Sequence, residues 1–142
     1  MISMNKEEPF ILWAEDDPDD FELFVDALHT NFPNVRVVHV KNGKEVMDKL
    51  DTLTNLPSLI VLDLNMPVLD GKATISQLKV NTRFYTLPII VLTTSSNSDE
   101  QHFFDHYNIE MITKPSKLSD IDIVVDKLVQ TCNAFREISE SR

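Results

Sequence analysis

The stretch LIVLDLNMPVLDG, residues 59–71, decides the fold class of this chain. It opens with an uninterrupted apolar run over 59–62, and Asp63 follows that run directly. A short continuous apolar run is typical of a strand that is buried on both faces, as in a parallel sheet. Asp70 and Gly71 stand where the pattern predicts that a helix over 70–80 begins. The stretch therefore predicts a buried strand, a loop that starts at Asp63, and a helix.

The same alternation of strand and helix continues on both sides of this stretch. Strands are predicted over 9–14, 35–40, 59–62, 88–92 and 108–113, and helices over 18–31, 42–53, 70–80, 98–107 and 116–135. Asp17 is a good N-cap, and Pro18 is a favourable first residue for the helix that follows it. Five strand–helix units in a row predict a parallel sheet with helices on both faces. In such sheets, ligands bind beyond the carboxyl ends of the strands.

Length, charge and cysteine content limit the class of protein. The 142 residues fit one domain, which we place at 9–136, with an N-terminal extension over 1–8 and a tail over 137–142. The formal net charge of −10 disfavours binding to nucleic acid and to anionic membranes. Cys132 is the single cysteine, and no apolar run approaches the ~20 residues that span a membrane. We therefore expect a cytoplasmic protein.

Polar residues stand directly after four of the predicted strands. Glu15 and Asp16 follow the first strand, Asp63 the third, Thr93 the fourth and Lys114 the fifth. Several carboxylates that share a small site repel one another unless a cation compensates them. Mg²⁺, with its preference for oxygen ligands, is the usual cation where phosphate is handled. A carboxylate beside a metal, an amine and a hydroxyl is well arranged to accept a phosphoryl group and to neutralise its oxygens.

Four motifs in this order resemble the receiver domain of two-component response regulators, the chemotaxis regulators included. They are ILWAEDDP at 11–18, VLDLNMP with DG at 61–71, PIIVLT at 88–93 and TKP at 113–115. The resemblance covers nearly the whole chain and implies a flavodoxin-like, doubly wound sheet of order 2-1-3-4-5 with five helices. Within the family, the EDDPDD and NMP stretches look similar to stand-alone receivers, including those associated with phytochromes.

The resemblance assigns roles to the acidic residues. It implies that Asp63 accepts the phosphoryl group and is also a ligand of Mg²⁺. Asp16 would bind the metal directly, Glu15 would bind it through water, and the backbone carbonyl of Asn65 would complete the protein ligands.

The resemblance also assigns roles to residues at the ends of the fourth and fifth strands. Lys114 would contact the phosphoryl oxygens, and Thr93 would move towards them as the switch. The Lys114–Pro115 peptide bond would be cis. Met111 stands where many receivers have an aromatic residue coupled to that switch.

The function expected from this resemblance is signalling by phosphorylation, with no catalytic output of its own. The donor would be a sensor histidine kinase or a histidine phosphotransfer protein, and a downstream protein would receive the signal. The face formed by 98–107, 108–113 and 116–135 could carry a homodimer. One alternative is a haloacid-dehalogenase-like phosphatase, although Asn65 replaces the aspartate that serves those enzymes as acid and base. Another is a protein-binding module that is not phosphorylated.

Overall fold

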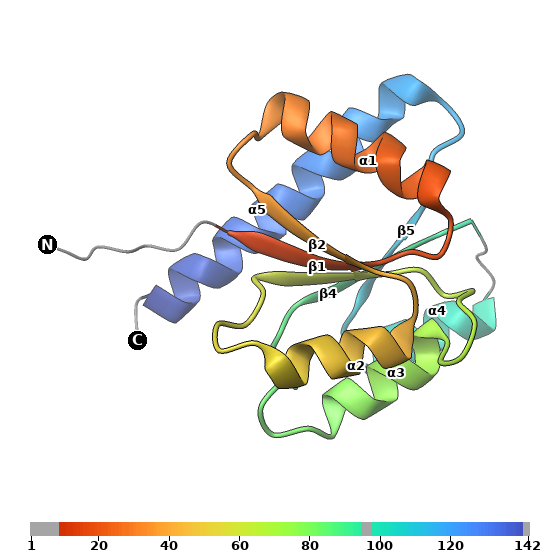
Figure 1. Ribbon diagram of the computed structural model, residues 1–142. Helices are drawn as coiled ribbons and strands as arrows, with labels where there is room; N and C mark the ends of the chain where they lie inside the picture. Colours follow the sequence, from red (N-terminus) through yellow and green to blue (C-terminus); the bar gives the residue numbers. More distant parts are fainter. Residues whose placement is uncertain (1–8, 95–97, 141–142) are drawn as a thin grey trace, which may run out of the picture.

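The computed structural model describes residues 9–94 and 98–140, which form one five-stranded parallel sheet with helices on both faces (Figure 1). The strand order is β2-β1-β3-β4-β5, which confirms the predicted doubly wound topology. The strands are β1 (Phe10–Ala14), β2 (Arg36–Val40), β3 (Leu59–Leu62), β4 (Ile89–Thr93) and β5 (Glu110–Thr113). The helices are α1 (Pro18–Asn31), α2 (Gly43–Thr52), α3 (Gly71–Lys79), α4 (Ser98–His106) and α5 (Ile121–Glu140), with a 3-10 turn, η1 (Leu118–Asp120), before α5.

Burial along the strands follows from their place in the sheet. β1, β3 and β4 lie inside the sheet and are buried along their whole length, which explains their continuous apolar sequences. β2 and β5 are the edge strands, and their residues are exposed or half-buried, apart from buried Val40. The carboxyl ends of these three inner strands therefore lie together at one end of the sheet, and so do the residues that follow them.

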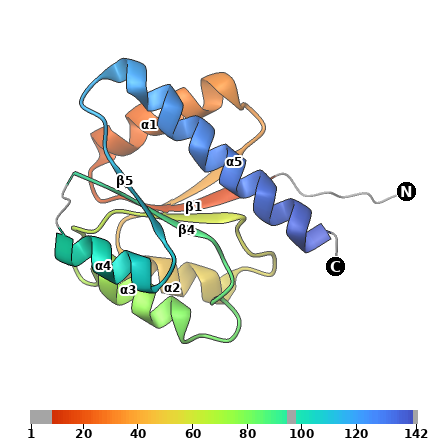
Figure 2. The ribbon, with the colours of Figure 1, turned by 180° about the vertical axis from the view of Figure 1, so that it is seen from behind.

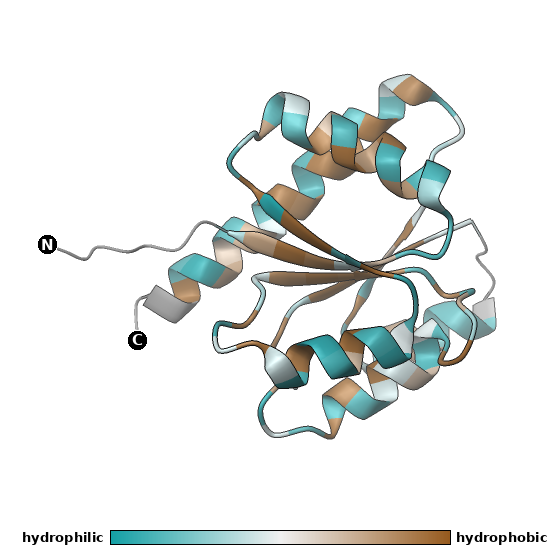
Figure 3. Cartoon of the chain, in the orientation of Figure 1, coloured by the Kyte–Doolittle hydropathy of each residue, from teal (hydrophilic) through white to brown (hydrophobic). Residues whose placement is uncertain are grey.

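Two apolar layers cover the two faces of the sheet. Helices α1 and α5 lie on one face, and α2, α3 and α4 lie on the other (Figures 1 and 2). Alternate residues of β1 pack into the two layers, because successive side chains of a strand point to opposite faces of the sheet. Leu12 packs with the α2, α3 and α4 layer, and Trp13 packs with the α1 and α5 layer. Coloured by hydropathy, the chain shows brown strands between helices that turn their teal faces outward (Figure 3).

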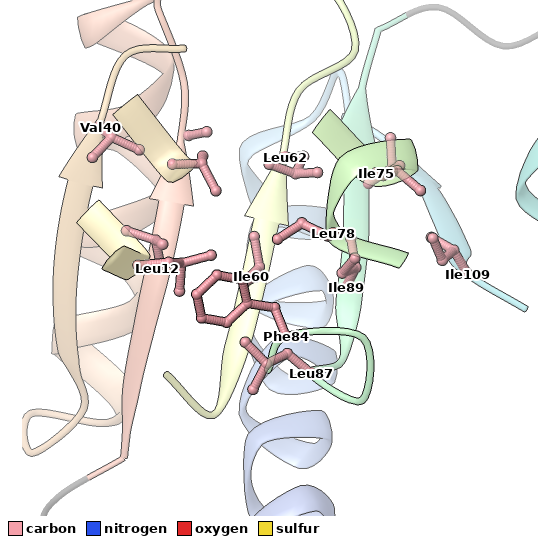
Figure 4. Packing of buried hydrophobic residues seen from close by; sticks show 14 of the residues in the cluster. Leu12, Val40, Ile60, Leu62, Ile75, Leu78, Phe84, Leu87, Ile89 and Ile109 are labelled. Carbon is pink, nitrogen blue, oxygen red and sulfur yellow. The ribbon is translucent and has the colours of Figure 1, made fainter. Parts of the chain in front are cut away.

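The core under α2 and α3 includes one large side chain from the connection between α3 and β4. Phe84 is almost fully buried and lies beside Ile60 of β3 and Leu87 (Figure 4). The next residue, Tyr85, is instead 53% exposed. This connection therefore contributes one aromatic ring to the core and leaves its neighbour in solvent.

The structure differs from the sequence-based prediction mainly at the last helix. We expected a helix over 116–135, but η1 occupies 118–120 and α5 runs from Ile121 to Glu140. The turn carries exposed Leu118, and the apolar stripe of α5 begins at Ile121, which packs under the sheet. The expected extension over 1–8 lies outside the described residues, and so do residues 141–142 of the expected tail. No helix within 9–94 and 98–140 combines the length and apolarity needed to cross a lipid bilayer.

Candidate functional site: an acidic cluster around one lysine

The residues that follow β1 and β3 form an acidic cluster. Glu15, Asp16 and Asp63 each offer a carboxylate oxygen, and the three oxygens lie within 4.8 Å of one another. Glu15 and Asp63 are buried, at 2% and 8% exposure, whereas Asp16 is exposed. β1 and β3 are neighbouring parallel strands, so their carboxyl ends necessarily meet. This set of oxygen donors, open to solvent on the side of Asp16, could hold a hard divalent cation.

Lys114, which follows β5, lies against this cluster with its side chain only 8% exposed. Its Nζ donates to Glu15 Oε1 at 2.6 Å and to Asp63 Oδ2 at 3.3 Å. It also donates to Asp20 Oδ2, in the first turn of α1, at 2.9 Å. One ammonium group is therefore shared by three carboxylates that come from three different segments of the chain.

Burial and charge set the protonation of Glu15. Loss of solvent is the largest influence and raises the pKa of this carboxyl to about 7, and the negative charge of Asp63 acts in the same direction. The hydrogen bond from Lys114 and the one from the backbone N–H of Asp17 oppose this rise. Near neutral pH, Glu15 is consequently poised between its charged and neutral forms.

The pKa of Lys114 moves in the opposite sense to that expected for a buried amine. Burial alone lowers it, but the hydrogen bonds to Glu15 and Asp20 and the charge of Asp63 outweigh burial, so the net shift is upward. Lys114 therefore stays charged throughout the physiological pH range and supplies a fixed positive charge to the cluster.

The loop between β3 and α3 is held at several points. The N–H of Asn65 donates to Asp63 Oδ1 at 3.3 Å, and the N–H of Gly71 donates to the carbonyl of Leu64 at 3.1 Å. The N–H of Gly43, at the start of α2, donates to the carbonyl of Leu69 at 3.0 Å. These bonds fix the orientation of the backbone that carries the carbonyl of Asn65.

Two residues of this loop show how tightly it is built. A Cβ on Gly71 would lie 2.7 Å from the carbonyl oxygen of Asp63, so the close packing at this position requires glycine. Val68 is 76% exposed and has a φ of 70°, an unusual conformation for a β-branched residue. Nothing in the sequence predicts this strain, since neither glycine nor asparagine stands at the position.

Thr93 and Lys114 are linked through the backbone. Thr93 ends β4 and is fully buried, and the N–H of Lys114 donates to its carbonyl at 2.8 Å. The Lys114–Pro115 peptide bond is trans, so the expectation of a cis bond was wrong. The trans form is the intrinsically preferred one for a bond to proline, by about 0.5–1 kcal/mol.

An aromatic group lies behind the cluster. Phe21 of α1 stacks on His39 of β2 with 3.7 Å between ring centroids and meets the indole of Trp13 edge-on at 5.8 Å. His39 Nε2 lies 2.8 Å from the backbone oxygen of Glu15, so this nitrogen carries a proton and donates it. The buried Trp13 stands two residues before Glu15 in the sequence. It contacts Phe21, which stacks on His39, and His39 in turn holds the backbone oxygen of Glu15.

The sequence-predicted residues are found where the topology requires them. Glu15, Asp16, Asp63 and Lys114 come together, Asn65 is joined to Asp63, and Thr93 lies on the adjacent strand. Asp20 was not predicted as a partner of Lys114. A signal for it existed, because a helix that starts directly after β1 must place its first turn beside the same edge.

The fold and this site define a receiver domain. The model of the response regulator receiver domain family matches residues 11–126, and the chain belongs to that family. It is homologous to single-domain response regulators of two-component systems, for which phosphorylation of an aspartate is the expected mechanism.

Individual relatives agree with this assignment. Response regulator Rcp1 of Synechocystis is 31% identical over 132 residues, which cover 88% of this chain and 86% of Rcp1. The probable methanogenesis regulatory protein FilR2 of Methanothrix harundinacea is 30% identical over 132 residues, covering 88% and 84%. The crystal structure of the phosphorylated cyanobacterial phytochrome response regulator RcpA superimposes with a TM-score of 0.77 at 30% identity, covering 84% of this chain and 89% of RcpA. The Mn²⁺-bound form of Rcp1 superimposes with a TM-score of 0.75 at 29% identity, covering 82% and 88%.

Proposed function

We propose that this protein accepts a phosphoryl group on Asp63 in a Mg²⁺-dependent reaction and signals through the resulting change of conformation. The observation that carries the proposal is the position of Asp63 at the end of β3, within the acidic cluster and 3.3 Å from the ammonium of Lys114. A carboxylate oxygen of Asp63 attacks phosphorus, and the bond from phosphorus to the donor breaks. The donor's leaving group departs with the bonding electrons and takes up a proton from solvent.

The residues around Asp63 fit the needs of this reaction. Asp16 and Asp63 would hold the metal directly, with the carbonyl of Asn65 and, through water, Glu15; the bound cation supplies charge neutralisation for the phosphoryl oxygens. Lys114 remains protonated and would donate to one phosphoryl oxygen. The hydroxyl of Thr93 would donate to another, and its movement would carry the switch. Phosphoryl transfer depends mainly on such positioning and charge compensation.

The donor and target follow from the same proposal. A sensor histidine kinase or a histidine phosphotransfer protein would supply the phosphoryl group in the cytoplasm, and a downstream protein would recognise the altered surface. Because Rcp1 and RcpA are similar over most of their length, a kinase of the phytochrome-associated type is the first donor to test. The face of α4, β5 and α5 would carry the output or a homodimer, and exposed Leu118 and Ile123 beside it supply apolar surface. Sedimentation with and without beryllofluoride tests the dimer.

Incubation with acetyl phosphate and Mg²⁺, followed by intact-mass measurement, tests the proposal directly. The wild type should gain the mass of one phosphoryl group, and Asp63→Asn and metal-chelated protein should gain none. Beryllofluoride titration followed by the fluorescence of Trp13 is the complementary assay, since an aspartyl phosphate is labile. An unmodified wild type that also gives no beryllofluoride response would refute the phosphoacceptor role. Equal binding of a partner by wild type and Asp63→Asn would support the non-phosphorylated binding module instead, and steady turnover of p-nitrophenyl phosphate would support the phosphatase.

A further inference from the structure

The contacts of Lys114 include one carboxylate that the proposed phosphorylation does not explain. The two shortest bonds from Nζ, at 2.6 Å and 2.9 Å, go to Glu15 and Asp20, and the longest, at 3.3 Å, goes to Asp63. Asp20 lies at the rim of the site, with 39% of its side chain exposed against 8% for Lys114. Asp20 is therefore the more exposed of these two partners of the lysine, since Glu15 is only 2% exposed.

The local sequence fixes Asp20 in this position. Asp17 Oδ1 accepts hydrogen bonds from the N–H groups of Asp19 and Asp20, at 3.0 Å and 3.2 Å, and so caps α1. Pro18 is the first helical residue, and its ring restricts the backbone of that turn. The capped first turn holds the backbone of Asp20 rigidly at the edge where β1 ends.

We propose that Asp20 is a positioning residue for Lys114, an inference that rests on the function proposed above. A lysine ammonium has three hydrogens at the end of a flexible four-carbon chain. Glu15 and Asp20 accept two of them in the two shortest bonds, and the third hydrogen faces Asp63. When Asp63 carries a phosphoryl group, that third hydrogen can turn to a phosphoryl oxygen while the two anchoring bonds remain. Asp20 thus acts on the direction of the ammonium group and not on the phosphoryl group itself.

A different role for Asp20 predicts the opposite change in the rate of phosphorylation when Asp20 is replaced. If its negative charge mainly repelled anionic phosphoryl donors, removal of that charge would speed phosphorylation. A positioning role requires an acceptor oxygen, which asparagine retains and alanine lacks. Asp20→Asn and Asp20→Ala therefore separate the two roles, because they remove the same charge and differ in the acceptor.

The test compares these two variants with wild type and with Asp19→Ala. Asp19 is an exposed carboxylate on the same turn, so its removal controls for charge and for the helix terminus. With acetyl phosphate and Mg²⁺, we expect Asp20→Ala to be phosphorylated about tenfold more slowly, the effect of one lost hydrogen bond to a charged group. Asp20→Asn should recover most of the wild-type rate, and Asp19→Ala should match wild type. An Asp20→Ala rate equal to or above wild type would overturn the proposal, and so would equally slow alanine and asparagine variants.

A second readout does not depend on phosphorylation. The ammonium resonance of Lys114 in lysine-labelled protein should be observable in wild type and Asp20→Asn, since anchored hydrogens exchange slowly, and should be lost in Asp20→Ala. Persistence of that resonance in Asp20→Ala would show that Asp20 does not anchor the amine. If wild type fails to accept phosphate but the resonance behaves as expected, the proposed function fails and the anchoring stands. Thermal unfolding of each variant separates both results from a loss of fold.

Discussion

Replacement of Glu15 by glutamine should flatten the dependence of stability on pH. The Glu15 carboxyl has a pKa of about 7 in the folded protein against 4.5 for an unperturbed glutamate, so the folded state binds its proton more tightly than the unfolded state. The stability that this raised pKa contributes is present in full below the pKa of the group in the unfolded state. It is lost as the pH rises through the pKa of the group in the folded state. This difference in pKa corresponds to about 3 kcal/mol in total, most of which falls between pH 5 and pH 8.

Urea denaturation of the metal-free protein at several pH values from 5 to 8 measures this effect. The wild type should lose about 2–3 kcal/mol of unfolding free energy over that range relative to Glu15→Gln, which keeps an oxygen to accept from Lys114 but does not titrate. Asp19→Asn, which removes an exposed carboxylate, controls for the change in net charge. Parallel curves for wild type and Glu15→Gln would refute the reasoning, because they would show that burial of Glu15 costs the folded state nothing.

Three further substitutions test the packing and the cap. Gly71→Ala should destabilise the fold by about 1–3 kcal/mol in urea denaturation, because the new Cβ would meet the carbonyl oxygen of Asp63 at 2.7 Å; an unchanged midpoint would contradict this. Phe84→Ala should cost about 3–5 kcal/mol, against about 0.5 kcal/mol or less for exposed Tyr85→Ala, and similar thermal shifts for the two would be the opposing result. Asp17→Ala should cost about 0.5–2 kcal/mol through loss of the cap, with Asp17→Ser close to wild type; equal losses would argue against capping.

The sequence predicted the sheet well because its strongest signals are local. The apolar run before Asp63 and the Asp17–Pro18 start of α1 depend on neighbouring residues, and α1 begins and ends at the predicted residues. The start of α5 was placed five residues too early, at 116 instead of Ile121. Ser116 is a plausible helix start in sequence, but the chain makes the η1 turn before the apolar stripe of α5 meets the sheet.

The candidate site was predictable to the extent that topology alone determines it. Parallel strands bring their ends to one edge, so the convergence of Glu15, Asp63 and Lys114 followed from the strand order. The contact of Asp20 with Lys114 was missed although the start of α1 places Asp20 near this edge, because a carboxylate in the first turn of a helix is already explained by the helix dipole. The left-handed backbone at Val68 also gave no sequence signal, because neither glycine nor asparagine stands there; in the structure the N–H of Leu69 donates to the carbonyl of Pro67 across it at 2.8 Å.

The loop between β3 and α3 has a consequence for how the chain can vary in length. Surface loops with exposed tips usually tolerate extra residues, because their backbone groups can turn to water. This loop has an exposed tip at Val68, yet the carbonyls of Leu64 and Leu69 on either side accept bonds from the N–H groups of Gly71 and Gly43. An added residue would break one of these bonds and disturb the backbone that carries the carbonyl of Asn65. Insertions in this loop should therefore destabilise the protein despite its surface position, whereas single replacements of exposed Val68 should be tolerated.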